Sequence, residues 1–228
     1  MEGTYDIIDL SRPFHTNMPV FPAIPKTFLG IYKGHQEGLV PPNFSAQTNI
    51  LVTSDHAGTH IDAPLHFNPE GAGIDQFPVD LLMGSAVMQD FSSKKSGESV
   101  RLEEVKQKMD GIKADPKKLK YVLFRTGAAE LYYTDQYLSH YLEIHVDAVS
   151  WLADQGVLVF GVDANTVDHA KDRLTHLLMK KRMCFHIENL VNLEKLPQDR
   201  PFTFICNPLI LKGSSGSPFR AFAFVNRN

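Results

Sequence analysis

The chain has 228 residues, enough for one large domain with a buried core, and 43% of them are hydrophobic and 21% charged. Its formal net charge at pH 7 is −3 and it contains no basic block, so we expect neither a nucleic acid nor a membrane surface as a partner. Two cysteines, Cys184 and Cys206, are too few for a disulfide framework, and both lie in apolar runs typical of buried thiols. The sequence has no secretory leader pattern and no run of 18 apolar residues, so we predict a soluble, cytoplasmic protein.

The N-terminal part of the chain combines a short strand with a proline-rich segment. Residues 5–10 are mostly apolar and predict a strand, whereas residues 11–47 are predicted to be irregular because six prolines interrupt them. A segment of this length without regular structure is unusual in a compact domain unless it is functional or forms an arm. Its aromatic stretches at residues 18–22 and 28–32 fit a pocket wall as well as core packing or a subunit contact.

The rest of the chain alternates between apolar runs and amphipathic segments. Strands are predicted at residues 49–53, 84–91, 121–127, 157–163, 183–193, 202–205 and 219–225, and helices at residues 101–110, 147–155 and 172–182. The order strand, helix, strand over residues 121–163 indicates a mixed α/β domain with at least one parallel pair of strands. The strand ends should bring Arg125, Thr126, Asp163 and Asn165 to one edge of the sheet. Residues 212–218 are predicted to be a loop.

The most distinctive stretch, residues 53–67, contains three of the ten histidines and two aspartates. His56, His60, Asp62 and His66 follow the pattern His-x-x-x-His-x-Asp-x-x-x-His. These side chains supply nitrogen and oxygen donors of the kind that Zn, Mn or Fe(II) accepts. A polar loop that carries its histidines by chance is the alternative, but five such donors rarely lie so close together. The pattern therefore predicts most of a metal site.

The helical zinc signature His-Glu-x-x-His is only superficially similar to this stretch. Ala57 stands where that signature has its general base, and Gly58 weakens a helix. Pro64 favours an extended conformation for the residue before it. We therefore predict a turn that enters a short strand, with His60 and Asp62 on one face of the strand. A zinc endoprotease is the least favoured hypothesis.

A second group of possible ligands lies more than a hundred residues downstream. It comprises Asp168, His169, Asp172, His176, His186 and Glu188, and spacing alone does not choose among them. His186 and Glu188 share a face if their segment is a strand. Glu188 stands out because an acid in an apolar strand needs a counter-charge such as a metal ion.

The stretch from His56 to Phe67 resembles the His-x-Gly-Thr-His-x-Asp-x-Pro-x-His signature of the cyclase-type metal-dependent hydrolases, which include bacterial kynurenine formamidase and isatin hydrolase. Further similar motifs lie at residues 6–11, 161–163, 167–169, 176–190 and 216–221, so the resemblance covers essentially the whole chain. It implies a single domain over residues 1–228, of the mixed α/β, swivelling β/β/α type, with an irregular proline-rich arm within residues 1–47.

The resemblance also implies roles for particular residues. The first metal ion would be held by His56, His60 and Asp62. Asp62 would bridge to a second ion held by His176, and Glu188 could contact both ions. His66 would donate and accept protons, and the other histidines, including His186, would not be ligands. The implied cofactor is Zn or Mn, with one or two ions per subunit, and the implied assembly is a homodimer or homotetramer.

The implied reaction is the arylformamidase-like hydrolysis of a small non-peptide amide by metal-activated water, with His66 as the proton shuttle. Phe21 precedes Pro22 at a place where kynurenine formamidases tend to carry a tryptophan near the aromatic substrate. Phe21 is therefore the candidate substrate-binding residue, and an isatin-like cyclic amide or a lactone is an alternative substrate. A non-catalytic metal-binding or small-molecule-binding protein is the other hypothesis, but such a protein would not need His66. The sole tryptophan, Trp151, is expected in the core.

Overall fold

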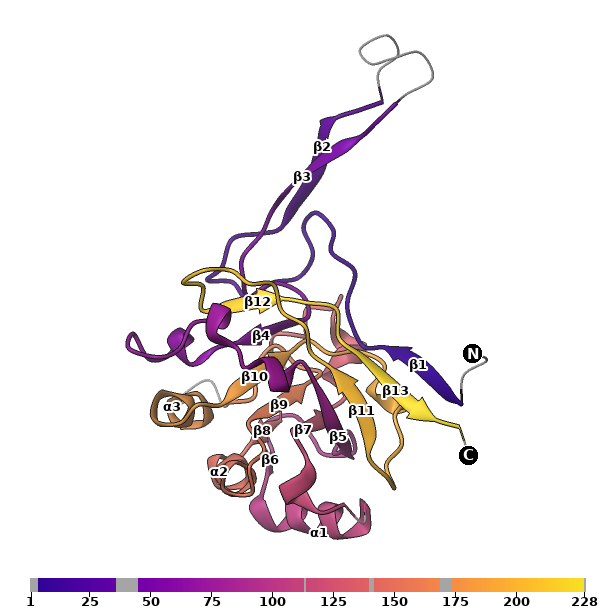
Figure 1. Cartoon of the computed structure of the whole chain (residues 1–228), viewed down its shortest axis with the longest axis vertical. Helices are drawn as coiled ribbons and strands as arrows, with labels where there is room; N and C mark the ends of the chain where they lie inside the picture. Colours follow the sequence, from indigo (N-terminus) through magenta and orange to yellow (C-terminus); the bar gives the residue numbers. More distant parts are fainter. Residues whose placement is uncertain (1–3, 36–44, 113, 140–141, 169–173, 228) are drawn as a thin grey trace.

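The computed structural model describes residues 4–35, 45–112, 114–139, 142–168 and 174–227. These residues form one mixed α/β domain with a curled nine-stranded sheet and a projecting hairpin (Figure 1). The strands are β1 (Tyr5–Asp9), β2 (Phe28–Lys33), β3 (Thr48–Val52), β4 (His60–Asp62), β5 (Met83–Asp90), β6 (Ser99–Val100), β7 (Tyr121–Arg125), β8 (Glu143–Ile144), β9 (Val159–Val162), β10 (Phe185–Glu188), β11 (Phe202–Ile205), β12 (Gly216–Pro218) and β13 (Phe222–Asn226). The α-helices are α1 (Leu102–Ile112), α2 (Val146–Asp154) and α3 (Leu174–Lys181).

The large sheet has the strand order β1-β13-β11-β5-β7-β9-β10-β4-β12. Its centre, β5-β7-β9-β10, is parallel, which confirms the predicted parallel pairing, and the strands on either side are antiparallel. Each of the three α-helices connects two consecutive strands of the parallel centre, as parallel pairing requires. No helix within the described residues is both long and apolar enough to cross a membrane.

Two apolar clusters fill the two faces of the sheet, and β7 divides its side chains between them. Val122 and Phe124 pack in the cluster beneath the α-helices, which includes Val105 and Met109 of α1. The alternate residues of β7 pack in the second cluster, under the short 3-10 helices between β4 and β5. The buried, unpaired thiols of Cys184 and Cys206 match the sequence-based expectation. Trp151, expected in the core, is only partly buried and packs against the first cluster.

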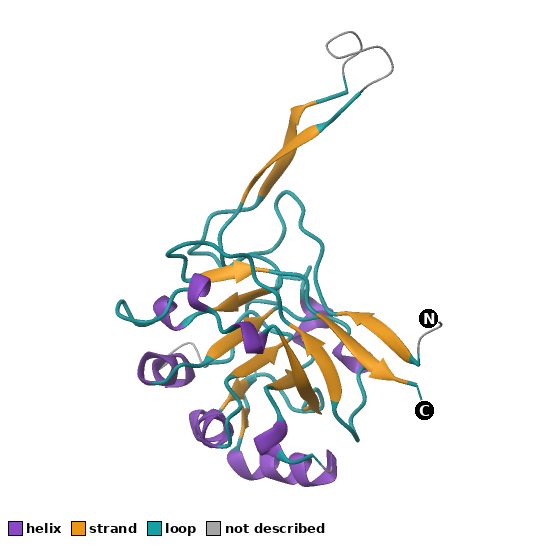
Figure 2. Ribbon diagram, in the orientation of Figure 1, coloured by secondary structure: helices purple, strands orange, loops and turns teal. Residues whose placement is uncertain are grey.

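The N-terminal arm is only partly irregular. Residues 11–27 contain no helix or strand, as predicted, but Phe28–Lys33 forms β2, which pairs with β3 in a hairpin that projects from the body (Figure 2). The prediction of irregular structure was wrong for β2 because the six prolines flank this stretch and none lies within it.

The prediction of a loop over residues 212–218 was also wrong in part. Gly216–Pro218 forms β12, which pairs with β4 at the edge of the large sheet. Glycine, serine and proline have low intrinsic preference for strands, so this strand depends on its tertiary partner and not on local sequence.

Candidate metal centre

The candidate site is built on one face of two neighbouring antiparallel strands, β4 and β10. In their register His186 lies opposite Asp62 and Glu188 lies opposite His60, with Ile61 opposite Ile187 between them. Because successive side chains of a strand point to opposite faces, the four donors share one face and the two isoleucines share the other. All four donors are buried, and both isoleucines lie in the apolar cluster below. The motif His-x-Asp of β4 and the motif His-x-Glu of β10 thus place four donor side chains side by side on one face. We call these four side chains the donor square.

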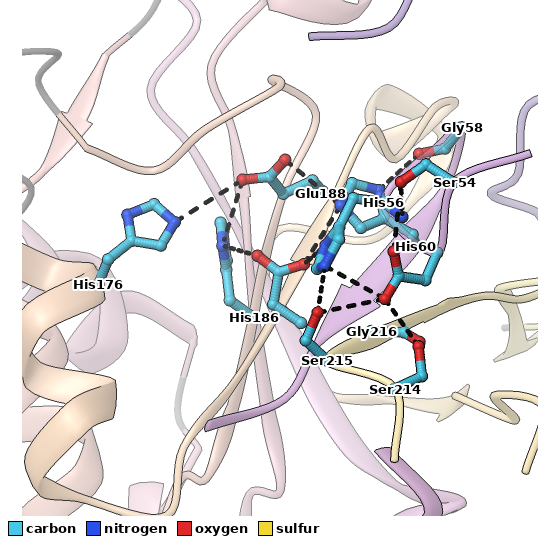
Figure 3. Close-up of polar contacts among 12 residues, drawn as sticks. Ser54, His56, Gly58, His60, His176, His186, Glu188, Ser214, Ser215 and Gly216 are labelled. Atoms are coloured by element: carbon cyan, nitrogen blue, oxygen red, sulfur yellow. Dashed lines mark hydrogen bonds and ion pairs between the residues drawn. The ribbon is translucent and has the colours of Figure 1, made fainter. Parts of the chain in front are cut away.

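The donor atoms lie close enough together to hold metal ions (Figure 3). Asp62 Oδ1 lies 2.7 Å from His56 Nδ1 and 3.3 Å from His60 Nε2. The Glu188 carboxylate lies 3.6 Å from His60 Nε2 and 4.0 Å from His176 Nε2. The possible ligands form two groups, and within each group the donor atoms lie within 4.8 Å of one another. One group comprises Asp62, His176, His186 and Glu188, and the other comprises His56, Asp62 and His66. Asp62 belongs to both groups.

Hydrogen bonds on the far side of two histidine rings turn their Nε2 atoms toward this centre. His60 donates its Nδ1–H to the Gly58 carbonyl at 2.8 Å, which leaves its Nε2 atom facing the carboxylates of Asp62 and Glu188. His176 donates its Nδ1–H to Asp168, which also accepts the backbone N–H groups of Thr175 and His176 at 2.8 Å each. Asp168 was one of the possible ligands in the sequence, but it lies behind His176 and orients it.

The turn before β4 depends on a glycine, as the sequence predicted. Gly58 has a φ of +63°, which other residues rarely adopt, and a Cβ at this position would lie 2.8 Å from the Phe14 ring. This conformation aims the Gly58 carbonyl at the imidazole of His60, and it thereby fixes the orientation of that ring.

A C-terminal loop supports His56, and sequence reasoning did not predict it. His56 Nε2 lies 2.9 Å from the Ser215 hydroxyl, while Ser214 and Ser215 donate to the Asp55 carboxylate at 2.7 and 3.2 Å. A Cβ on Gly216 would lie 2.7 Å from Cε1 of His56, so only glycine fits there. The signals in the sequence are the run Gly-Ser-Ser-Gly at residues 213–216 and the family-like motif that begins at Gly216.

The charges of the site favour ionised carboxylates. Burial would raise the pKa of Asp62, but the neighbouring His56 outweighs this effect and holds it well below its usual range. Burial disfavours the His56 imidazolium, yet Asp62 raises the pKa of His56 above its ordinary value. Burial lowers the pKa of His186 to about 3, so this ring is neutral.

His66 lies at the open side of the centre, in the 3-10 helix Pro64–His66 that follows β4. Its side chain is exposed at one edge, and its ring centroid lies 3.9 Å from that of His56 and 4.3 Å from that of Phe67. Desolvation of the packed side, together with the neighbouring histidines, outweighs the attraction of Asp62 and lowers the pKa of His66 to about 4. The ring is therefore a neutral proton acceptor near pH 7.

Six of the seven predicted site residues converge here, namely His56, His60, Asp62, His66, His176 and Glu188. Phe21 lies in the N-terminal arm with 42% of its surface exposed. A cavity of about 1110 Å³ adjoins the His56 side, lined in part by Arg12, Phe14, Ser54, Asp55 and Phe219, and its described lining does not include Phe21. His169 and Asp172 lie outside the described residues.

Three of the residues named in the sequence analysis at the strand ends make contacts that stabilise the fold and do not form part of the metal centre. Asp163 accepts the N–H groups of Thr126 and Gly127 at 2.8 and 2.9 Å. Arg125 turns away and pairs with Asp90 at 2.9 Å. The Asp163 contacts tie the ends of β7 and β9 together, and the Arg125 pair ties β7 to β5.

Comparison with known proteins agrees with this geometry. The Cyclase family model matches residues 8–169, which is more than half of the chain. Kynurenine formamidase from Paracidovorax citrulli is 30% identical over 215 residues, covering 93% of this chain and 94% of that protein. Kynurenine formamidase from Salinibacter ruber is 33% identical over 179 residues, covering 78% and 79%. The solved structure of isatin hydrolase A from Labrenzia aggregata has a TM-score of 0.86 at 21% identity, covering 98% of this chain and 95% of that one, and so shares the fold. The chain belongs to the Cyclase family.

Proposed function

We propose that this protein is a metal-dependent hydrolase of small, non-peptide amides, of the arylformamidase type. The observation that carries the proposal is the buried donor square on β4 and β10, with a neutral histidine, His66, at its open side. The kynurenine formamidase relatives support the same class of reaction, the cleavage of a C–N bond.

The donor set suits a divalent cation. The first position is formed by His56, His60 and Asp62, and the second by Asp62, His176 and Glu188. Their chemistry, neutral imidazole and carboxylate, fits Zn or Mn with one or two ions per subunit. When bound, the cation supplies Lewis-acid chemistry, because it lowers the pKa of water and polarises an amide carbonyl.

The protein itself supplies orientation and proton transfer. The carbonyl of Gly58 and the carboxylate of Asp168 fix the rings of His60 and His176. His66 accepts the proton of the attacking water at its free ring nitrogen and delivers it to the leaving nitrogen of the amide. Its lowered pKa keeps the ring unprotonated at neutral pH, and it makes the protonated ring a stronger acid, which favours the second transfer, to the leaving nitrogen.

The substrate is a small molecule, and two chemical classes are proposed. A formyl amide of an aromatic amine follows from the kynurenine formamidase relatives. A cyclic amide such as isatin, or a lactone, is the alternative, favoured by Phe21 in place of the tryptophan expected in kynurenine formamidases. In either case Phe21 is the proposed aromatic contact from the N-terminal arm.

We further propose a homodimer or homotetramer. The β2–β3 hairpin exposes apolar side chains that a second copy would cover, among them Phe28, Ile31, Tyr32 and Leu51, which are 50%, 64%, 76% and 51% exposed. Sedimentation of the full chain tests this assembly. The cytoplasmic location stays a prediction from sequence.

The function is tested by removing metal from the purified protein and then adding back Zn or Mn. Activity is measured on formyl-anilines, isatin and simple lactones. We expect turnover to disappear with the metal and to return with it. Undiminished turnover by metal-free protein would contradict metal dependence, and binding without turnover across the panel would indicate a non-catalytic binding protein.

A further inference from the structure

The resemblance to the family leaves His186 without a role, but its position in the structure is that of a ligand. His186 is completely buried, and it lies on the donor face of β10, directly opposite Asp62 and two residues before Glu188. Its Nδ1 atom is 3.5 Å from Glu188 Oε1 and 3.9 Å from Asp62 Oδ2. The ring is thus aimed at both carboxylates.

The two ring nitrogens of His186 are the strongest sign of a missing partner. Within the described part of the chain, neither Nδ1 nor Nε2 makes a hydrogen bond, although both are buried. A buried imidazole without hydrogen bonds costs free energy, and natural proteins keep such groups where another partner binds them. By contrast, His56, His60 and His176 each have a hydrogen bond on a ring nitrogen.

Packing around His186 holds the ring in this orientation. Its face stacks on Phe160 with the centroids 5.0 Å apart, and the ring of His176 meets it edge-on at 5.6 Å. A histidine retained only for its volume would not need the edge carrying Nδ1 to face two carboxylates.

We infer that His186 is a fourth protein ligand at the second position, binding the metal ion there together with Asp62, His176 and Glu188. This inference rests on the proposed function, since it concerns the same centre. The two positions then differ in kind. Four protein donors match the number in closed zinc sites, whereas His56, His60 and Asp62 leave the first position open, as in catalytic zinc sites. The second ion is therefore held more tightly and contributes structure, and the first position is where the substrate reacts.

The test is ion binding by the full chain carrying His186→Leu, a change that removes both ring nitrogens and leaves an apolar side chain of similar volume. Zinc affinity is measured by competition with a chromophoric chelator, with His15→Leu as the control that removes a partly buried histidine outside the centre. We expect the tighter zinc affinity to fall by more than about tenfold in His186→Leu, because even residues outside the ligand set typically contribute about 10- to 100-fold. The weaker affinity and the control should match the wild type.

A different result is expected if His186 has a purely structural role. In that case His186→Leu would alter the thermal midpoint of the metal-free protein but leave both zinc affinities unchanged, and the inference would be overturned. If wild-type protein binds no divalent ion at all, the proposed function itself fails, so the two failures are distinguishable.

A second measurement does not depend on the folding of the variant. In wild-type protein labelled with 15N-histidine, one His186 ring nitrogen should shift on zinc addition, as the nitrogens of His60 and His176 do. His15, which lies outside the centre, serves as the unshifted internal reference. An unshifted His186 with shifted His60 and His176 would overturn the inference.

Discussion

The strand pairs β4–β10 and β2–β3 are both short and antiparallel, yet they lie in opposite environments. Every residue of β4 and β10 is buried, whereas β2 and β3 are exposed along almost their whole length. In the first pair the donors His60 and Glu188 face one side, and Ile61 and Ile187 face the apolar cluster on the other. In the hairpin, apolar side chains such as Ile31 and Tyr32 face solvent.

The difference shows what fixes the geometry of a site. A two-stranded hairpin is at best marginally stable alone, so the positions of side chains on β2 and β3 depend on whatever covers them. The donors of β4 and β10 are held from behind by close-packed isoleucines and from the sides by neighbouring strands. Groups that must hold a metal ion within a few tenths of an ångström therefore belong on a buried strand pair such as β4–β10.

The largest expected effect is a loss of catalytic rate when His66, beside the donor face, is replaced. His66→Ala should lower kcat by about 10²- to 10⁴-fold, the usual contribution of a general acid–base group, with the metal content unchanged. Steady-state kinetics and elemental analysis of the same preparation check both parts. Loss of metal from the variant would instead make His66 a ligand.

A matched pair of isoleucines tests the comparison of the two strand pairs directly. Ile61→Ala leaves a cavity behind the donor face and should lower the free energy of unfolding by about 2–5 kcal/mol. Ile31→Ala, on the hairpin, should change it by less than about 0.5 kcal/mol. Urea unfolding at several protein concentrations separates folding from association. Equal losses in the two variants would mean that the hairpin is as much a part of the core as β4.

A smaller effect is expected from the hydrogen bond behind His176. Asp168→Asn removes the carboxylate that holds the ring, so the affinity for metal should fall by about 10- to 100-fold. Zinc titration against a competing chelator measures this change. Unaltered affinity would show that the packing of α3 alone orients His176.

The smallest expected effect is the change of kcat/KM with pH. His66 must be neutral to accept a proton, and with a pKa of about 4 it stays almost fully neutral down to pH 5. kcat/KM should therefore change by less than about twofold between pH 7 and pH 5, whereas a histidine of ordinary pKa would lose roughly 20-fold. Excess metal and a parallel measurement of bound metal keep the site loaded. A steep loss below pH 6.5 would show that His66 is not held neutral by its surroundings.

Much of the centre could be predicted because its chemistry is concentrated in short motifs. His56, His60, Asp62 and His66 lie within eleven residues, and strand alternation correctly placed His60 and Asp62 on one face. The apolar runs of β7 and β9 likewise indicated buried parallel strands. Local sequence did not predict β12 or the serines that support His56, because their partners lie more than 150 residues away.

The sequence by itself determined the donor types, the strand alternation and the family to which the chain belongs. The family resemblance implied that His176 and Glu188 join this site, but only the tertiary structure brought His186 onto the same face. The register between β4 and β10 sets His186 against Asp62 and Glu188 against His60. Asp168 lies behind His176 because it accepts hydrogen bonds from the first turn of α3. The physical reason is that alternation fixes the face of each side chain within a strand, but pairing between strands fixes its neighbours.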